Sequence, residues 1–364
     1  MSQERDDRRC VAITGSSGMI GAALSKALRD RGDRVVHVVR RQPRADGLED
    51  GVREVQWAPE QREFDTAILD GVTTVVHLAG AGIGDHRWTS SYKEAIRASR
   101  VDGTEAVAAA VAARPAVRLI SGSAIGYYGD RGSDVLTEDS GLGEGFLAEV
   151  CRDWEAATWR ARQAGASVAL ARTGIVLSPS GGAMGRMLPL AKFGLAGPLG
   201  SGKQFWAWIT LHDQIRALLF LVDRPQISGP VNLTAPTPDP QVDVVKALGE
   251  ALRRPTVLPA PTIALRVALG EMAGDILGSQ RALPTVLSEA GFRWDHAELD
   301  AAMAWLTEQT VKRPGDSDGT VDSDDTGDAG GLVDSDGAGD SRDYENSVPT
   351  NSESEPDKRQ DAPG

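Results

Sequence analysis

The sequence predicts an α/β fold of the Rossmann type, which is a doubly wound parallel sheet, followed by a smaller C-terminal α+β part and a disordered acidic tail. Three observations lead to this prediction. Short apolar runs alternate with helical stretches in the first half of the chain, a glycine-rich turn follows the first run, and acidic residues gather at the C-terminal end. Strands that alternate with helices form right-handed βαβ units and a parallel sheet with helices on both faces.

The expected strands are short and rich in β-branched residues, as buried parallel strands are. They cover Cys10–Thr14, Arg34–Val39, 73–79, 117–121 and 168–177. Helical spacing is found between them over 18–31, 91–113 and 146–164. These elements predict a Rossmann domain over residues 1–178, which strand segments from 205–235 are expected to join.

The pattern changes after residue 179, where Gly and Pro become frequent and aromatic residues cluster at Phe205, Trp206 and Trp208. Helical segments are expected over 214–222, 240–253, 262–277 and 297–306. We therefore expect a smaller domain over 179–312 that closes over the sheet and carries a substrate site.

The net charge of -13 is concentrated at the C-terminal end. Residues 313–364 hold 15 acidic against 4 basic side chains, so they carry -11 and the rest of the chain carries -2. The tail has too little apolar surface to offset the entropy cost of ordering, and we expect it to be disordered, with a role in solubility or partner contact. The nearly neutral body argues against a nucleic-acid-binding face.

Other classes of protein are disfavoured by what the chain lacks. Cys10 and Cys151 form neither a disulfide framework nor a zinc site, and no metal is expected. No signal-peptide core and no long uncharged apolar run is present, so we expect a cytoplasmic protein with no membrane contact.

A phosphate-binding turn is expected directly after the first strand, where the sequence reads TGSSGMIG. Such a turn needs residues without Cβ, so that the backbone can approach a pyrophosphate at the N-terminus of the following helix. The alternative is a merely structural glycine turn. The predicted cofactor-binding residues here are Gly15, Ser16, Ser17, Gly18, Met19, Ile20 and Gly21.

The end of the second strand selects the dinucleotide. An acidic residue there would favour NAD, whereas this chain has Arg40 and Arg41. A guanidinium can pair with the 2′-phosphate of NADP(H). NADP(H) is therefore the predicted cofactor, and we expect Arg40 to make most of the contact with the 2′-phosphate. The alternative is that both arginines are a solvated strand end.

Two further strand ends are expected to border the cofactor crevice. The first ends in Leu78, Ala79 and Gly80, and the second ends in Ser121, Gly122 and Ser123. The small residues at the first strand end would let the ribose of the cofactor approach. The second strand ends beside the nicotinamide in this architecture.

The segments TGSSGMIG, HLAG, SGSAIGYYG and ARTGIVL, in this order, resemble atypical short-chain dehydrogenase/reductases of the NAD-dependent epimerase/dehydratase group. The later segments WAWITLHD, GPVNLTAP, ALRRPTVLPAP and SQRALPTVLSEAGFRW resemble one subfamily, the epimerase family proteins with a small C-terminal domain of unknown function. The resemblance covers residues 11–306. It implies a Rossmann fold and NADP(H), but no substrate.

The chain departs from the resemblance at the catalytic pair. Enzymes of this superfamily use Tyr-x-x-x-Lys on the helix after the serine-bearing strand, where Tyr transfers a proton and Lys lowers the pKa of Tyr and holds the ribose. Here the pair is replaced by Phe146 and Val150 or, in the other register, by Leu147 and Cys151. The usual mechanism is therefore in doubt.

Other groups are candidates for the chemistry. Ser123 matches the active-site hydroxyl of the superfamily, and Tyr127 or Tyr128 could donate a proton, unless the two form an aromatic wall. Glu144, Glu149 and His212 are weaker candidates, and Asp213 is expected to cap the helix that follows it. Predicted substrate contacts are Lys192, Gln204, Trp206 and Trp208, with core packing as the alternative for both tryptophans.

Two functions remain open from the sequence. The first is an oxidoreductase or epimerase that acts on a small carbonyl, hydroxyl or nucleotide-linked compound. The second is a non-catalytic protein that senses NADP(H) and contacts a partner. A homodimer is compatible with both.

Overall fold

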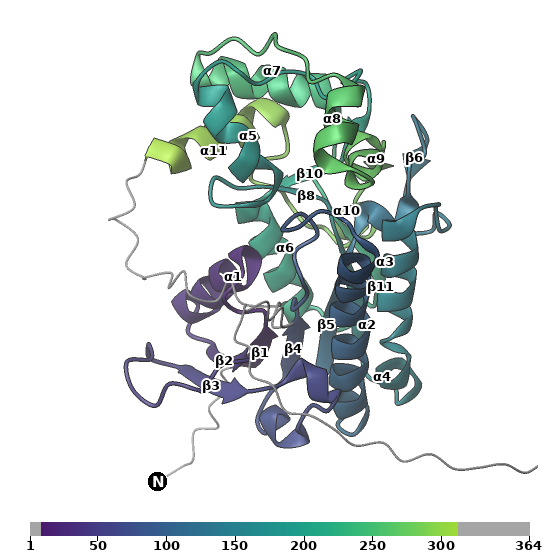
Figure 1. The fold of residues 1–364 in the computed structure, drawn as a ribbon. Coiled ribbons are helices and arrows are strands. Elements are labelled where there is room, and N and C mark those ends of the chain that lie inside the picture. The colour runs from purple at the N-terminus through teal and green to yellow at the C-terminus, as the bar shows by residue number, and fades with distance from the viewer. Residues whose placement is uncertain (1–8, 312–364) are drawn as a thin grey trace, which may run out of the picture. The chain divides into compact units, whose positions relative to one another are not determined.

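Seven parallel strands form the central sheet of the computed structural model, which describes residues 9–311 (Figure 1). The strand order is β11-β7-β5-β4-β1-β2-β3. The bounds are β1 Cys10–Thr14, β2 Arg34–Val39, β3 Val52–Gln56, β4 Thr74–His77, β5 Arg118–Ala124, β7 Val168–Thr173 and β11 Gly229–Leu233. Because the chain runs to one edge from β1 and then returns to β4, the order reverses between these two strands. Ligands of open α/β sheets bind at such a reversal, beyond the carboxyl ends of the strands.

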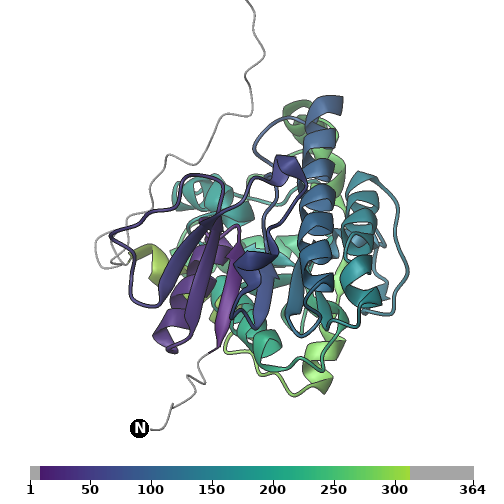
Figure 2. The ribbon, with the colours of Figure 1, turned by 90° about the horizontal axis from the view of Figure 1, so that it is seen from below.

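Helices cover both faces of this sheet, which confirms the predicted fold class (Figures 1 and 2). One face packs against α2 (Ser90–Ala112), α3 (Phe146–Ala156) and α4 (Trp159–Gln163), and the other against α1 (Met19–Asp30) and α6 (Leu211–Asp223). Side chains of β1 alternate between the two cores, with Ala12 in one and Val11 and Ile13 in the other.

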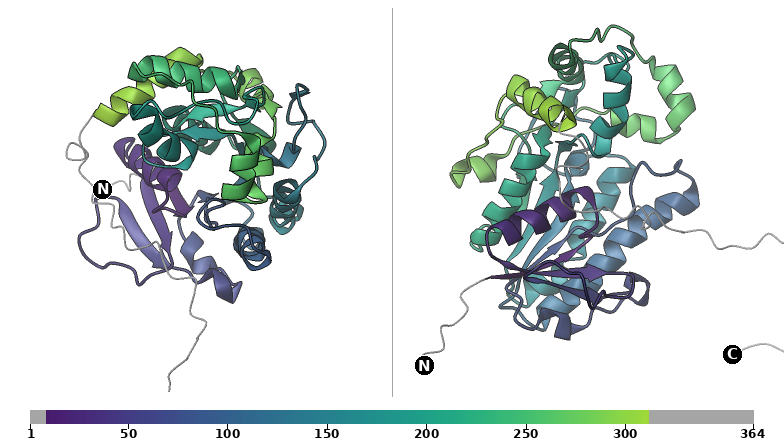
Figure 3. Two further views of the ribbon diagram at one scale, coloured as in Figure 1. Left: turned by 45° about the horizontal axis from the view of Figure 1, so that its top comes forward. Right: turned by 90° about the vertical axis from the view of Figure 1, so that its left-hand side faces the viewer.

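The later part of the chain builds a third apolar core. Its helices lie above the sheet in Figure 1 and are seen from two other sides in Figure 3. Its helices are α5 (Gly182–Lys192), α7 (Gln241–Leu252) and α11 (Leu299–Val311). Shorter helices are α8 (Thr262–Leu269), α9 (Met272–Leu277) and α10 (Thr285–Glu289). Two-stranded pairs connect this part: β8 (Ile175–Leu177) with β10 (Trp208–Thr210), β9 (Phe205–Trp206) with β12 (Asp239–Pro240), and β6 (Val135–Leu136) with β13 (Arg281–Ala282).

Several predicted elements are divided in the structure. The single strand expected over 168–177 is broken at Gly174, where a Cβ would lie 2.4 Å from the Ala207 carbonyl oxygen, and its second half, β8, leaves the main sheet. The helix expected over 262–277 is interrupted at Gly270, whose φ is +63°. Of the strand segments expected from 205–235, only β11 joins the main sheet.

The two predicted domains lie within one compact unit, so a boundary near residue 178 stays a prediction. The tail predicted to be disordered lies outside the described residues. Within residues 9–311, no helix is both long enough and apolar enough to cross a bilayer.

Candidate functional site

The glycine turn between β1 and α1 has the geometry of a phosphate cradle. Gly15 has a φ of +70°, and a Cβ on it would lie 2.9 Å from the Leu78 carbonyl carbon. A Cβ on Gly21 would lie 2.1 Å from the Gly15 carbonyl oxygen, so the first turn of α1 packs directly on the loop. Gly18 is the N-cap and offers no side-chain acceptor to the first N–H groups of the helix. These donors suit an anionic ligand.

A buried pair of side chains ties β1 to β4 at the same edge. Thr14 Oγ1 lies 2.7 Å from His77 Nδ1 and accepts hydrogen bonds from the N–H groups of Leu78 and Ala79. The other ring nitrogen, Nε2, is buried and has no hydrogen-bond partner within residues 9–311. Burial lowers the pKa of His77 to about 4, which keeps the ring neutral. Thr14 opens the segment TGSSGMIG and His77 opens HLAG, but sequence reasoning missed the contact between them because the two residues are 63 positions apart.

The two arginines after β2 have different surroundings. Arg41 makes a two-pronged pair with Glu54 of β3, at 2.7 and 2.8 Å, and Arg44 adds a third contact at 2.9 Å. The hydrogen bond from Arg41, with those from Arg44, lowers the pKa of Glu54 to about 2. The guanidinium of Arg41 is thus engaged with an acidic partner that the sequence analysis did not identify. The backbone carbonyl of Arg40 accepts a hydrogen bond from Gln56.

The end of β4 lies beside the glycine turn, and β5 is the next strand of the sheet. Leu78 and Ala79 are half-buried and Gly80 is exposed, so this segment forms a surface at the crevice. Ser121 is fully buried, and its hydroxyl donates to the Gly122 carbonyl. A Cβ on Gly122 would lie 2.8 Å from the Trp154 ring, so only glycine lets α3 approach β5 this closely.

Ser123 is the first member of a buried polar network. Its hydroxyl donates to Glu155 Oε1 at 2.7 Å. Arg172 binds the same carboxylate through Nε and Nη2, at 2.8 and 2.9 Å. All three side chains are buried, and the contact with Glu155 fixes the orientation of the serine hydroxyl.

The two adjacent tyrosines contact the same arginine in different ways. The hydroxyl of Tyr128 accepts from Arg172 Nη1 at 3.0 Å and donates to Asn232 Oδ1 at 2.8 Å, and the residue is fully buried. Burial raises the pKa of Tyr128. Tyr127 is half-buried, and the guanidinium of Arg172 lies 3.6 Å from the centroid of its ring. Tyr128 therefore has a packing role in this structure, whereas Tyr127 is partly accessible.

The register of α3 identifies the replacement of the usual Tyr and Lys. A Cβ on Gly126, in the turn after β5, would lie 3.5 Å from Leu147 and 3.9 Å from the Cys151 sulfur. Phe146, Leu147 and Val150 all pack in the apolar cluster around Trp88, but only Leu147 and Cys151 also lie next to Gly126. Leu147 and Cys151 thus face the end of β5. Burial raises the pKa of Cys151 to about 12, so its thiol is not ionised at neutral pH.

The predicted substrate contacts are mostly interior. Trp206 and Trp208 belong to the third core, and Trp208 Nε1 donates to Asp239 at 2.8 Å. Gln204 is buried and donates to the Leu199 carbonyl. Lys192, at the end of α5, is exposed. These positions agree with the packing alternative for both tryptophans and place Gln204 in a structural role as well.

The weaker candidates lie in other places. Glu144 and Glu149 are exposed. His212 lies 2.7 Å from Asp295, and the N-cap of α6 is Thr210, not Asp213 as predicted. Asp213 instead accepts the N–H groups of Asp295 and His296. Atoms of His212, Asp213 and His296 come within 4.8 Å of one another, but Arg216 already occupies Asp213 Oδ1 at 2.8 Å.

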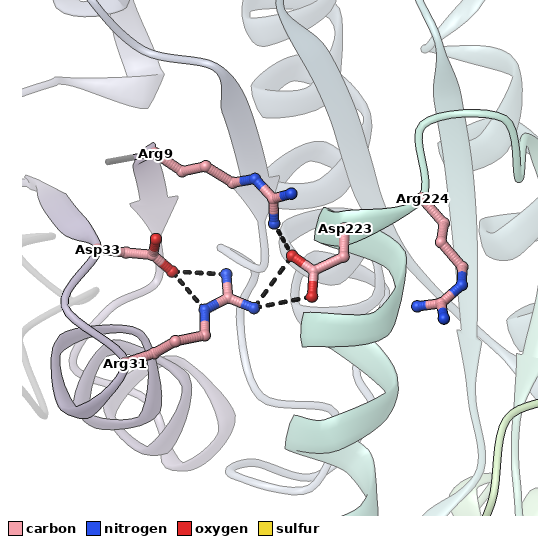
Figure 4. A pocket seen from close by; sticks show the side chains of 5 residues that line it. All are labelled: Arg9, Arg31, Asp33, Asp223 and Arg224. Atoms are coloured by element: carbon pink, nitrogen blue, oxygen red, sulfur yellow. Dashed lines mark hydrogen bonds and ion pairs between the residues drawn. The ribbon is translucent and has the colours of Figure 1, made fainter. Parts of the chain in front are cut away.

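A pocket of about 720 Å³ lies at the opposite, amino end of the strands and is unrelated to this crevice (Figure 4). Four of its five charged groups are paired with one another, since Arg31 binds both Asp33 and Asp223 and Arg9 binds Asp223. The crevice is therefore identified by strand topology and turn geometry, not by the size of a cavity.

Comparison with known proteins agrees with this geometry. Residues 11–233 match the NAD dependent epimerase/dehydratase family, and residues 260–306 match a domain of unknown function, DUF1731. An epimerase family protein of Mycobacterium tuberculosis is 46% identical, over 84% of this chain and 98% of that protein.

Two solved structures are also similar. The human epimerase family protein SDR39U1 with NADPH has a TM-score of 0.74 and 28% identity, over 82% of this chain and 99% of that one. A nucleoside-diphosphate sugar epimerase from Corynebacterium glutamicum has a TM-score of 0.65 and 38% identity, over 82% of this chain and 57% of that one.

Proposed function

The chain belongs to the NAD dependent epimerase/dehydratase family, and from this premise we propose that it binds NADP(H) at the carboxyl ends of β1, β4 and β5. There it acts as an oxidoreductase or epimerase on a small carbonyl or hydroxyl compound, or on a nucleotide-linked one. The observation that carries the proposal is the glycine cradle, in which a Cβ at Gly15 or Gly21 would collide with backbone.

The residues of the cradle fit a dinucleotide. The N–H groups of the turn and of the first residues of α1 would hold the pyrophosphate, and Leu78, Ala79 and Gly80 would border the ribose. When bound, the cofactor supplies or accepts a hydride at C4 of its nicotinamide ring.

The preference for NADP(H) rests on the arginines after β2. Both arginines follow β2 at the carboxyl edge of the sheet, and we assign the 2′-phosphate mainly to Arg40. The human relative solved with NADPH supports this choice.

The protein's own groups then determine what the substrate must offer. The hydroxyl proton of Ser123 is directed to Glu155, so the serine oxygen presents lone pairs and accepts a hydrogen bond from a substrate hydroxyl. Of the two tyrosines, Tyr127 is the proposed proton-transfer group, because the hydroxyl of Tyr128 is enclosed between Arg172 and Asn232. Lys192 is the remaining accessible candidate for contact with an anionic substrate.

The test is a titration of the purified protein with NADPH and NADH, followed by the fluorescence of the bound nicotinamide. Tight NADPH binding with weaker NADH binding is expected. Carbonyl compounds are then added to the NADPH complex, and loss of the nicotinamide signal with one of them would identify the substrate class. Absence of binding by either nucleotide would overturn the proposal.

A second function is favoured by one observation, the apolar Leu147 and the un-ionised Cys151 in place of Tyr and Lys. It is a protein that binds NADP(H) without chemistry and presents its surface to a partner according to the redox state of the cofactor. Tight NADPH binding without oxidation by any carbonyl compound would favour this function.

A further inference from the structure

Cys151 leaves the end of β5 without the positive charge that a lysine would supply at this position. The thiol is buried and un-ionised, and it accepts a backbone hydrogen bond from Ala124. A cation near this place must therefore come from another element. Two arginines lie near enough to act on Cys151, Arg100 of α2 and Arg172 of β7, and Arg172 is already paired with Glu155.

Arg100 lies between the two strand ends that border the crevice. Its Nη1 donates to the Ala81 carbonyl at 2.9 Å, in the loop after β4. A Cβ on Gly80 would lie 3.4 Å from Arg100 Cζ. On the other side, its guanidinium lies 5.1 Å from the centroid of the Trp154 ring, which itself packs on Gly122 of β5.

The charge of Arg100 has no carboxylate partner among residues 9–311. Both of its hydrogen bonds there start from Nη1 and end on carbonyl oxygens, those of Ala81 and Ile96. The other guanidinium nitrogens make no hydrogen bond within the described part of the chain. Arg100 is half-buried, so its guanidinium is only partly hydrated, and a ligand oxygen can supply the acceptor that residues 9–311 do not supply to these nitrogens.

We infer that Arg100 is a positioning residue that holds the hydroxyl oxygens of the ribose next to the nicotinamide, in place of the lysine missing from α3. This inference rests on the proposed function, since it requires a dinucleotide in the crevice. The loop that Arg100 holds is also fixed by Tyr92, which donates to the Gly82 carbonyl, and by Ser99, which accepts from the Ala81 N–H. Trp88 and Arg186 also donate hydrogen bonds to this loop, at the Ile83 and Gly84 carbonyls. The loop therefore keeps these other tethers when Arg100 is changed.

The experiment compares two ligands on four proteins. Adenosine 2′,5′-bisphosphate carries only the adenine half of NADP(H), and NADPH carries both halves. The proteins are the wild type, Arg100→Gln, Arg100→Lys and the control Arg97→Met. The glutamine removes the charge and keeps a polar side chain. Arg97 lies on the same helix but pairs with Asp153. Binding is measured by calorimetry, which does not require turnover.

We expect Arg100→Gln to weaken NADPH binding by roughly tenfold and to leave binding of the bisphosphate unchanged. Arg100→Lys keeps the charge and should lose less, while Arg97→Met should bind both ligands as the wild type does. Unchanged NADPH binding by Arg100→Gln, or an equal loss for both ligands, would overturn the inference and leave the proposed function standing. A wild type that binds neither ligand would overturn both.

Discussion

The hydroxyl of Ser123 donates to Oε1 of Glu155 over 2.7 Å, although the two residues lie 32 positions apart. Glu155 in turn holds Arg172, whose guanidinium covers Tyr127 and binds the hydroxyl of Tyr128. The predicted catalytic residues thus belong to one buried network centred on an ion pair. Glu155, Arg172 and Tyr128 are buried and hold the network together, whereas Tyr127 is half-buried and partly accessible.

Replacing Glu155 with Gln should destabilise the fold strongly. The change leaves Arg172 as a buried charge without its carboxylate, and breaking a buried pair in this way costs about 3–5 kcal/mol. Ser123→Ala is the matched control, since it removes one hydrogen bond and should cost about 1 kcal/mol. Urea unfolding followed by circular dichroism measures both. Equal losses of unfolding free energy in Glu155→Gln and Ser123→Ala would contradict the view that the Glu155–Arg172 ion pair holds the network together.

The two tyrosines should respond differently to loss of their hydroxyls. Tyr128→Phe leaves Asn232 Oδ1 without its donor in the interior, at a cost of about 1–3 kcal/mol. Tyr127→Phe should leave the free energy of unfolding unchanged within about 0.5 kcal/mol and should lower turnover of any substrate identified. Turnover that survives in Tyr127→Phe would exclude this tyrosine as the proton-transfer group.

Gly21→Ala should destabilise the N-terminal half of the sheet and abolish dinucleotide binding. Its Cβ would lie 2.1 Å from the Gly15 carbonyl oxygen, so the helix must move away from the turn. We expect a loss of about 1–3 kcal/mol, as for overpacking elsewhere. Gly274→Ala, in α9, is the control, because its Cβ would meet nothing within 4 Å. A Gly21→Ala protein as stable as Gly274→Ala would contradict the packing described for the turn.

The sheet and the phosphate turn were predictable because local sequence determines them. Apolar runs of five or six residues specify buried strands, and Gly15, Gly18 and Gly21 stand at the strand–helix junction. The partners of the site were not predictable, because they come from distant positions. Glu54, Glu155 and Arg172 follow no spacing rule relative to Arg41 or Ser123. Trp206 and Trp208 were ambiguous for another reason, since an aromatic cluster has the same pattern in a core and in a ligand site.

His77 should make stability depend on pH below neutrality. Its pKa is about 4 in the folded protein and about 6.5 in the unfolded chain, so the unfolded state binds more protons between these values. The contribution is complete above about pH 6.5 and is lost as the pH falls towards about 4. The difference of about 2.5 units corresponds to about 3 kcal/mol. The measurement is the free energy of unfolding of wild type and His77→Gln from pH 7 to 4. The variant should lose less stability over this range, and parallel curves would show that His77 does not titrate as expected.

Arg40 and Arg41 can be separated by their effects on cofactor selectivity. If Arg40 holds the 2′-phosphate, Arg40→Met should weaken NADPH binding by roughly tenfold or more and leave NADH binding unchanged. Arg41→Met removes two hydrogen bonds from Glu54, so the pKa of that carboxyl should rise, while Arg44 still holds it. NADPH binding should then fall less than in Arg40→Met. The double variant Arg41→Met with Glu54→Gln distinguishes a direct contact from repulsion by the released carboxylate. Recovery of NADPH affinity in the double variant means that Arg41 acts by neutralising Glu54. If NADPH affinity does not recover, and the loss exceeds that of Arg40→Met, the 2′-phosphate is assigned to Arg41.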